Sequence, residues 1–132
     1  MAARLDHVTV TASDIAVSLA FYDSALGALG LVRLYESGDE EEDDPDLEAV
    51  AFGAAGGSAV LWVVSGPAAS CGLHVAFRAA HRNDVERFHA NGLAHGGAEH
   101  SAPRRWPIYR RGEFNAIIRD PDGNLVEAIS PE

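Results

Sequence analysis

The stretch Arg119-Asp-Pro-Asp-Gly-Asn-Leu-Val-Glu-Ala-Ile-Ser130, near the end of a 132-residue chain, decides the fold. Its first half predicts a tight turn, because Pro121 fixes its own φ and Gly123 accepts a positive φ without a Cβ clash. Its second half predicts a half-buried strand, in which Glu127 has apolar neighbours on its own face. Carboxylates are rarely buried unless they are paired or bind a metal. Glu127 is therefore either such a ligand or a solvated residue on an edge strand.

Upstream of this stretch, the chain repeats itself at an offset of 67 residues. Two strand-like segments, Leu5–Thr11 and Gly72–Arg78, carry a histidine at the same place. Six identities fall at this offset without a gap, and they pair His7 with His74, Val8 with Val75, Ala12 with Ala79, Phe21 with Phe88, Leu26 with Leu93 and Gly30 with Gly97. A repeat of this kind indicates two copies of one supersecondary unit.

Each copy is predicted to contain one strand, one helix and three further strands. In the first copy the helix follows Ser13 or Asp14 as its cap, and the strands are Leu5–Thr11, Leu31–Glu36, Leu47–Gly53 and Ser58–Val64. In the second copy the helix covers about Arg82–Leu93, and the strands are Gly72–Arg78, Glu99–Ala102, Phe114–Arg119 and Leu125–Ser130. We therefore expect an α+β protein with two tandem βαβββ modules in a single domain. The modules cover about residues 1–66 and 72–132, with a linker at about residues 65–71.

The net charge of −10 comes from one segment of the chain. Residues 1–66 carry two Arg against twelve acids, whereas residues 67–132 carry eight of each. Nine of the twelve acids lie between Glu36 and Glu48, so the excess belongs to a solvated acidic loop and not to the fold. Because the chain has no basic stripe, we expect neither nucleic acid nor an anionic membrane as its partner.

Two further features of the composition concern the compartment. No apolar run approaches the roughly 18 residues that a membrane span needs, and the N-terminus has no signal-peptide pattern. Cys71 is the only cysteine, so the chain forms no intrachain disulfide. These observations favour a cytoplasmic protein.

The repeated histidines predict a metal site. If the two matched strands lie symmetrically about a pseudo-twofold axis, His7 and His74 approach one another across a concave sheet. Glu127 joins them if its strand neighbours one of theirs. Two imidazoles and one carboxylate with open positions suit a divalent metal that acts as a redox or Lewis-acid centre. The structural alternative for each histidine is a cleft residue bonded to the backbone, but the repeat and Glu127 together favour the metal.

On these residues the chain resembles the vicinal oxygen chelate superfamily, which has the glyoxalase/bleomycin-resistance/dioxygenase fold. The resemblance covers essentially the whole chain and rests on Leu5–Val10, Asp14–Gly27, His74–Phe77 and Asp120–Glu127. It implies that the two modules form a concave, barrel-like mixed sheet. It also implies one divalent metal ion, with Fe, Mn, Ni and Zn all open, held by His7, His74 and Glu127.

The chain departs from glyoxalase I in one respect. That enzyme has a fourth metal ligand, a catalytic glutamate on the last strand of its first module. Here Ser58–Val64 offers Trp62 or Leu61 in this place, and neither side chain can bind a metal. The departure argues against glyoxalase I activity. A three-ligand site is closer to extradiol-type dioxygenases and to the thiol transferases of fosfomycin resistance.

Candidates for substrate binding are Trp62, Arg78, Trp106, Tyr109 and Asn115. Trp62 lies on a predicted strand that faces the cleft, and Arg78 shares the face of the second repeated histidine and would hold an anionic group. Trp106 and Tyr109 lie in a long segment of the kind that often gates a ligand site. Asn115 alternates with an apolar residue and is expected to face the cleft. The structural alternatives are a core aromatic for Trp62, an exposed ion pair for Arg78 and an ordinary surface loop for the long segment.

Two classes of function remain open from sequence alone. The first is a metal-dependent enzyme that acts on a small oxygen-chelating substrate as a lyase or isomerase, a dioxygenase or a thiol transferase. The second is a drug- or small-molecule-binding protein of the bleomycin-resistance kind, without catalysis. Similar proteins of this length usually form homodimers, with the site either inside one chain or shared between two.

Overall fold

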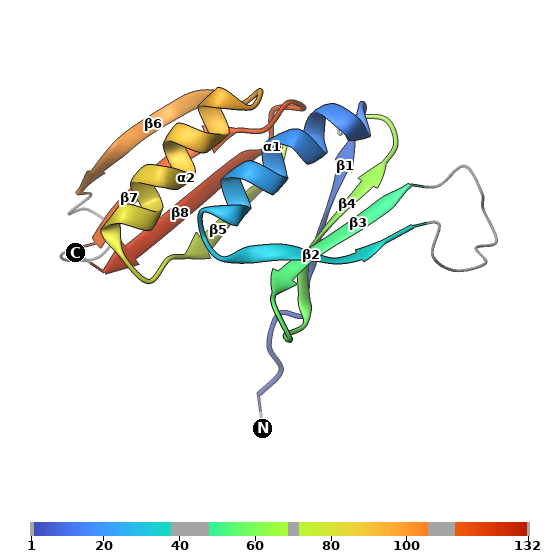
Figure 1. The fold of residues 1–132 in the computed structure, drawn as a ribbon, viewed down its shortest axis with the longest axis horizontal. Coiled ribbons are helices and arrows are strands. Elements are labelled where there is room, and N and C mark those ends of the chain that lie inside the picture. Colours follow the sequence, from blue (N-terminus) through green and yellow to red (C-terminus); the bar gives the residue numbers. More distant parts are fainter. Residues whose placement is uncertain (1, 38–47, 69–71, 106–112, 132) are drawn as a thin grey trace.

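The computed structural model describes residues 2–37, 48–68, 72–105 and 113–131. In this part of the chain the elements run in the order β1-α1-β2-β3-β4 and then β5-α2-β6-β7-β8 (Figure 1). The same order of elements thus occurs twice, as the internal repeat predicted. The expectation of an α+β protein with two βαβββ modules is confirmed.

The two modules have matching sheets. The first contains β1 (Val8–Ala12), α1 (Ile15–Gly27), β2 (Leu31–Glu36), β3 (Ala49–Ala54) and β4 (Ala59–Ser65). The second contains β5 (His74–Arg78), α2 (Arg82–Ala94), β6 (Ala98–Arg105), β7 (Glu113–Arg119) and β8 (Leu125–Pro131). The strand orders are β1-β4-β3-β2 and β5-β8-β7-β6. In each sheet the first pair is parallel and the other two pairs are antiparallel.

The start of β1 and the end of β6 differ most from their predicted positions. Strand β6 continues to Arg105, three residues beyond its predicted end, because Arg104 and Arg105 pair with β7. The register shifts between Ser101 and Arg104, around Pro103, which has no N–H to donate to a ladder. Strand β1 begins at Val8, so the first repeated histidine lies just outside it. The predicted linker at residues 65–71 is described only as far as residue 68.

Helix α1 begins and ends where its sequence predicts. Asp14 is the N-cap, and its Oδ1 accepts a hydrogen bond from the N–H of Val17 at 3.2 Å. The chain turns at Gly30, whose φ is +81°. The buried face of the helix carries Phe21 and Tyr22, which are fully buried. Tyr22 lies beside Phe52 of the first sheet, whereas Phe21 lies against Gly92 and Gly97 of the second module.

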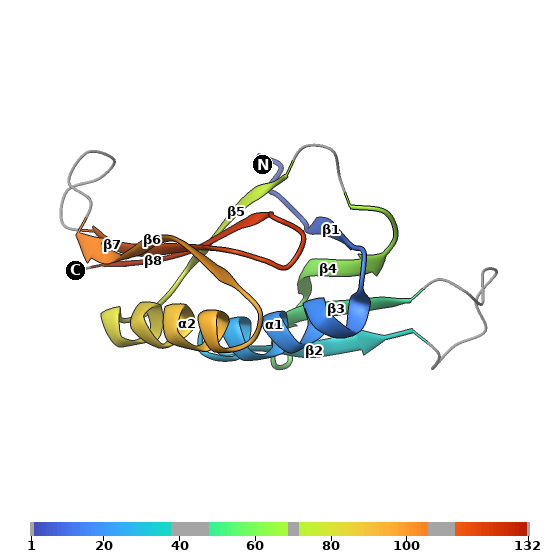
Figure 2. The same ribbon diagram turned by 90° about the horizontal axis from the view of Figure 1, so that it is seen from above.

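Helix α2 lies against the second sheet in the equivalent way. Val85 and Phe88 are fully buried, and Gly92 lies so close to β7 that a Cβ there would be 2.2 Å from Ile118 Cδ1. Figure 2 shows α1 and α2 side by side, on the same side of the strands of the second sheet. None of the described helices is long and apolar enough to cross a membrane.

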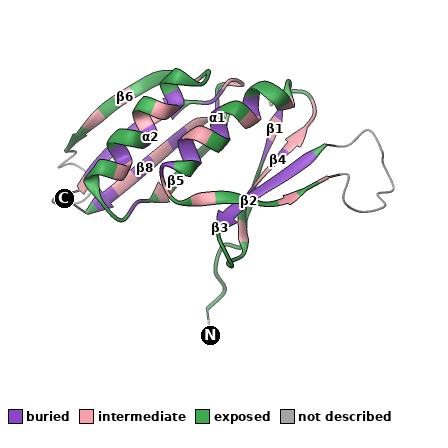
Figure 3. Ribbon diagram, in the orientation of Figure 1, coloured by how far each residue is buried: buried purple, intermediate pink, exposed green. Residues whose placement is uncertain are grey.

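The strands alternate between a face that packs on the helices and a face that does not. Along β8, Val126 and Ala128 are fully buried in the core, whereas Glu127 between them is only partly buried (Figure 3). The side chains of β5 and β7 alternate in register with those of β8. We call the opposite side of this sheet the helix-free face, and it carries His74, Ala76, Arg78, Arg104, Glu113, Asn115, Ile117, Arg119, Leu125, Glu127 and Ile129.

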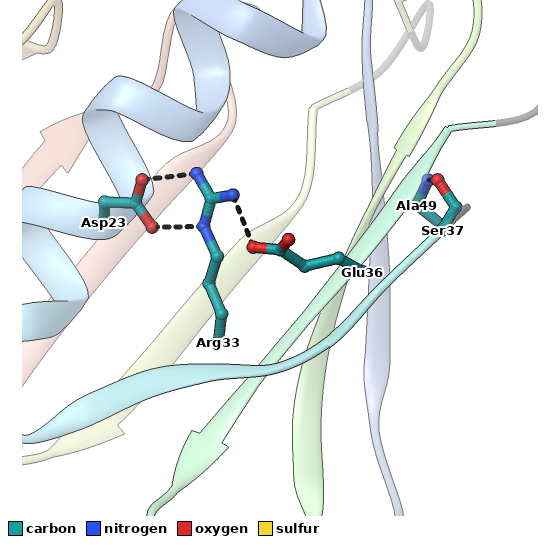
Figure 4. Close-up of polar contacts among 5 residues, drawn as sticks. All are labelled: Asp23, Arg33, Glu36, Ser37 and Ala49. Carbon is teal, nitrogen blue, oxygen red and sulfur yellow. Dashed lines mark hydrogen bonds and ion pairs between the residues drawn. The ribbon is translucent and has the colours of Figure 1, made fainter. Parts of the chain in front are cut away.

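Polar contacts fix β2 beside α1. Arg33 donates from Nε to Oδ1 of Asp23 on α1 at 2.8 Å, and from Nη1 to Oε1 of Glu36 at 2.8 Å (Figure 4). The end of β2 is closed by Ser37, whose N–H donates to the carbonyl of Ala49 at 2.8 Å and whose Oγ accepts from the N–H of Ala49 at 3.0 Å. The β2–β3 pair is therefore closed before the acidic segment, which lies outside the described residues.

The turn at residues 120–124 anchors β8 to the first module. Tyr22 of α1 donates from its hydroxyl to Oδ2 of Asp120 at 2.6 Å, and both groups are buried. Ser13 donates from its N–H to Oδ2 of Asp122 at 3.1 Å and from its hydroxyl to Oδ1 of the same residue. The turn closes through Gly123, whose φ is +90°. These contacts fix the turn from which the strand carrying Glu127 begins.

Candidate metal centre

His74 and Glu127 meet on the helix-free face of the second sheet. Strand β5 pairs with β8 in parallel, with Ala76 opposite Glu127, so His74 lies diagonally beside the carboxylate. The two side chains are hydrogen-bonded, with 2.7 Å between His74 Nε2 and Glu127 Oε1. The side chain of Glu127 is 13% exposed and that of His74 is 50% exposed. An imidazole nitrogen and a carboxylate oxygen thus lie together where a ligand from solvent can reach them.

Asn115 holds the other oxygen of the same carboxylate. Its Nδ2 donates to Glu127 Oε2 at 2.9 Å, and the residue is only 4% exposed. Its Oδ1 is buried and accepts no hydrogen bond in the described part of the chain. Asn115 was expected to bind substrate, and its contact with Glu127 was not predicted. The turn at residues 120–124 sets the register of β7 against β8, and this register would have placed Asn115 diagonally beside Glu127.

The donor atoms of this pair suit a divalent metal ion. Imidazole nitrogen and carboxylate oxygen are ligands of Fe, Mn, Ni and Zn in proteins. Two ligand atoms at right angles, each about 2.1 Å from an ion, are separated by about 3 Å, which is close to the separation of His74 Nε2 and Glu127 Oε1. Among the described residues, no three side chains of His, Cys, Asp or Glu are grouped closely enough to hold a metal. The structure therefore brings together two of the three residues that were expected to be ligands.

His7 does not join His74 and Glu127 within the described chain. It lies immediately before β1, and its Nδ1 is 2.7 Å from Oδ1 of the neighbouring Asp6. Its side chain is 45% exposed. Val8 pairs with Leu61 as Val75 pairs with Val126, so His7, just before β1, is equivalent in the chain to His74, the first residue of β5.

The strand register decides which residue of the first module is equivalent to Glu127. Thr9 lies opposite Trp62, and Ala76 lies opposite Glu127, and each lies two residues after its repeated histidine. Trp62 is therefore the equivalent residue, whereas Leu61 is fully buried in the core. The Trp62 ring lies 5.2 Å from the ring of Tyr35, measured between centroids. No carboxylate occupies this place in the first sheet.

The remaining candidates for substrate binding fall into two groups. Arg78 shares the helix-free face with His74 and donates from Nη2 to Oε1 of Glu113 at 3.2 Å, with its side chain 51% exposed. Trp106 and Tyr109 lie outside the described residues. Arg104 pairs with Asn115 and Arg119 pairs with Leu125, so these two arginines share the face with Arg78 and its two glutamates.

A family model and several solved structures match this chain. The model described as Glyoxalase/Bleomycin resistance protein/Dioxygenase superfamily matches residues 4–128. A glyoxalase/bleomycin resistance protein from Albidiferax ferrireducens has 26% sequence identity and a TM-score of 0.69, over 96% of this chain and 98% of that chain. Among curated proteins none matches significantly.

Two structures with lower identity show the same fold. The genomically encoded fosfomycin resistance protein of Listeria monocytogenes, complexed with Mn(II) and sulfate, has 19% identity and a TM-score of 0.64, over 100% of this chain and 95% of that chain. A glyoxalase I mutant from Zea mays has 19% identity and a TM-score of 0.69, over 94% of this chain and 46% of that chain.

Proposed function

Because this chain belongs to the Glyoxalase/Bleomycin resistance protein/Dioxygenase superfamily, we propose that it is a metal-dependent enzyme acting on a small substrate that has two neighbouring oxygen atoms. The observation that carries the proposal is the contact of 2.7 Å between His74 Nε2 and Glu127 Oε1 on an accessible sheet face. The Mn(II) in the fosfomycin resistance protein of the same fold supports a divalent ion. Fe, Mn, Ni and Zn all remain candidates.

The metal ligands in this proposal are His7, His74 and Glu127. When bound, the ion supplies Lewis-acid polarisation of the substrate oxygens and a template for the substrate. His74 offers its Nε2 and Glu127 its Oε1, while Asn115 retains the other carboxylate oxygen. The enzyme works in the cytoplasm, and its reaction is an isomerisation or lyase reaction, a dioxygenation or a thiol transfer. Glyoxalase I activity is disfavoured, because Trp62 stands where that enzyme would need a carboxylate.

The third ligand comes from a second copy of the chain. His7 lies apart from the pair, and no group of three ligand-type side chains forms within the described residues. His7 and His74 are nevertheless equivalent in the repeat, so a twofold arrangement brings the first module of one copy to the second module of the other. The homodimer then contains two sites, and each takes His7 from one copy and the pair His74 and Glu127 from the other.

The walls of each site bind the substrate. Trp62 and Tyr35 form an aromatic surface on the first sheet. Arg78 would hold an anionic group of the substrate in exchange for its ion pair with Glu113. Trp106 and Tyr109 would complete the site.

The aromatic surface also favours a second candidate function. Trp62 and Tyr35 form a partly buried aromatic pair, and aromatic side chains commonly line sites for hydrophobic ligands, as a drug-binding protein without catalysis would require. Turnover that depends on metal separates the two functions. A protein that binds an aromatic ligand equally well with and without metal, and converts none, would belong to the second class.

Metal content tests the proposed ligands. The protein is purified without chelator, and metal per chain is measured by elemental analysis for the wild type and for His7→Ala, His74→Ala and Glu127→Gln. About one metal per chain is expected in the wild type, with loss in all three variants. The exposed His100→Ala serves as the control and retains the metal. Wild-type metal content in the Glu127→Gln protein would contradict the ligand assignment.

Mixing two inactive variants tests the shared site. Unfolding and refolding His7→Ala together with His74→Ala forms mixed dimers, in which one of the two sites again has all three ligands. A random mixture is expected to bind about one quarter of the wild-type metal. If each site lay within one chain, the mixture would bind no more metal than the two variants alone.

A further inference from the structure

The carboxylate of Glu127 is held from two neighbouring strands. His74 on β5 contacts Oε1 at 2.7 Å, and Asn115 on β7 contacts Oε2 at 2.9 Å. In the antiparallel pair of β7 with β8, Asn115 lies opposite Ile129 and Ile117 lies opposite Glu127, so the amide and the carboxylate are diagonal neighbours on one face. Each oxygen of the carboxylate therefore has a partner of its own.

The chemistry of the contact fixes the direction of the amide. A carboxylate oxygen accepts hydrogen bonds, so the NH₂ group of Asn115 must face Glu127, and the opposite orientation would place two oxygens together. The amide is buried, and its Oδ1 has no hydrogen-bond partner among the described residues. The bond to Glu127 is thus the contact that orients this side chain.

The unpaired Oδ1 of Asn115 indicates that this residue positions Glu127 and is not present to stabilise the fold. A buried acceptor without a donor destabilises the folded chain, and an apolar residue would pack this sheet position without that loss. The neighbouring position on the same face of β7 is indeed apolar, at Ile117. A local departure from good packing of this kind points to function at the group that the amide holds, which is Glu127.

We propose that Asn115 is the positioning residue of Glu127. By donating a hydrogen bond to Oε2, it leaves Oε1 beside His74 Nε2 as the single oxygen available to the metal. A carboxylate that binds through both oxygens would occupy a further coordination position. The hydrogen bond from Asn115 to Oε2 therefore keeps that coordination position open for the second oxygen of the substrate. This inference rests on the proposed function, and it gives Asn115 a role other than the direct substrate contact expected from its sequence.

The test compares Co(II) binding by matched variants of the full chain. Asn115→Leu has a similar size and no hydrogen-bond donor. The control is Asn91→Leu, in which an amide that donates to the carbonyl of Ser24 at 3.2 Å is removed from α2. Loss of a residue that orients a ligand is expected to raise the Kd for Co(II) roughly 10- to 100-fold. The Asn91→Leu protein is expected to keep the wild-type Kd.

The visible spectrum of Co(II) provides a readout that a merely structural role would not change. In the Asn115→Leu protein the freed carboxylate binds through both oxygens, so the coordination number rises and the absorption bands weaken and shift. Wild-type affinity together with a wild-type spectrum in this variant would overturn the role of Asn115 and leave the proposed function intact. Absence of Co(II) binding in the wild-type protein would overturn the proposed function and, with it, this role.

A measurement on the wild-type protein covers the case in which Asn115→Leu does not fold. The side-chain NH₂ group of Asn115 is followed by NMR during a titration with Zn(II), a diamagnetic probe. Its hydrogens are expected to exchange slowly with water both before and after Zn(II) saturates the site, because the bond to Oε2 persists. Rapid exchange in the Zn(II)-bound protein would mean that this bond breaks on metal binding, and the proposal would be wrong.

Discussion

Tyr22 is the buried titratable side chain with the clearest consequence for stability. Its hydroxyl donates to Oδ2 of Asp120 at 2.6 Å inside the core. Burial first, and then the negative charge of Asp120, raises the pKa of Tyr22 well above its ordinary value. The folded protein therefore keeps this proton at alkaline pH values where the unfolded chain releases it.

Stability is accordingly expected to fall at alkaline pH. The contribution of Tyr22 is fully present below the pKa of about 10 in the unfolded chain, and it declines by about 1.4 kcal/mol for each further pH unit. Urea unfolding between about pH 8 and about pH 11 measures this decline. Tyr22→Phe should be about 1 to 3 kcal/mol less stable near neutral pH, through loss of a buried hydrogen bond, and should lose this part of the alkaline decline. Equal alkaline slopes in both proteins would contradict the prediction.

At the level of single residues, the sequence predicted the proximity of His74 and Glu127 better than the contacts that hold the surrounding structure in place. Strand alternation and the repeat were sufficient to select His74 and Glu127, which lie together in the structure. The bond between Tyr22 and Asp120 joins positions 98 apart, and no periodicity connects a helix residue to a turn so distant in the chain. The contact of Asn115 with Glu127 depends on the pairing of β7 with β8, which the predicted turn determines.

The turn at residues 120–124 offers a test at the level of one element. A Cβ at Gly123 or at Gly27 would meet no atom within 4 Å, but Gly123 has a φ of +90°, whereas Gly27 is the last residue of α1. Gly123→Ala is expected to lower the free energy of unfolding by about 1 to 2 kcal/mol, because an L side chain is strained in this conformation.

Gly27→Ala is the matched control, because it adds the same methyl group at a site with equal space. It is expected to leave the free energy of unfolding unchanged or to raise it by up to about 1 kcal/mol, since alanine reduces the freedom of the unfolded chain. Urea unfolding at neutral pH compares the two variants. A smaller loss in Gly123→Ala than in Gly27→Ala would show that backbone strain does not govern the turn.

The elements themselves were predictable wherever local chemistry decides them. Asp14 caps α1, and both helices and all eight strands occur near their predicted positions. The extent of β6 was not predictable, because pairing with β7 continues past Pro103 despite the missing donor. Tertiary pairing here overrides a local signal that ends strands.

The two modules are joined into one molecule by contacts between their helices and turns. Asp122, which belongs to the second module, accepts hydrogen bonds from Ser13 at the start of α1 and from Ser18 at 3.4 Å. Asn91 of α2 donates to the carbonyl of Ser24 on α1. Contacts of this kind couple the unfolding of one module to that of the other.

Asp122→Ala is therefore expected to increase amide hydrogen exchange in the first module, at the start of α1, although the substituted residue lies in the second. Asp84→Ala is the control. Asp84 accepts hydrogen bonds from nearby residues of the second module, namely the N–H of His81, which caps α2, and the side chain of Arg87 on α2. Its effect should stay within the second module. Mass spectrometry of exchanged peptides measures both. A change confined to β7 and β8 in the Asp122→Ala protein would mean that the turn does not couple the modules.

The arrangement of the two modules was the part that sequence predicted least. The repeat indicated that His7 and His74 occupy equivalent places, and the register agrees. It also indicated that the two histidines approach one another, but His7 is not grouped with His74 and Glu127 in the described chain. Sequence periodicity determines how strands pair within a module. The contacts between modules involve residues scattered along the chain, and no periodic pattern predicts them.

Because the β2–β3 pair is closed at its end, the interval between Ser37 and Glu48 is a suitable place to insert a foreign peptide. Ser37 is bonded to Ala49, and Glu48 is bonded through its backbone to Ser65, so both ends of the interval 38–47 are fastened to strands. The entropy of closing a loop changes only slowly with its length. Epitopes or reporter tags of other lengths and charges can therefore be grafted between Ser37 and Glu48 without shifting the strands that receive them.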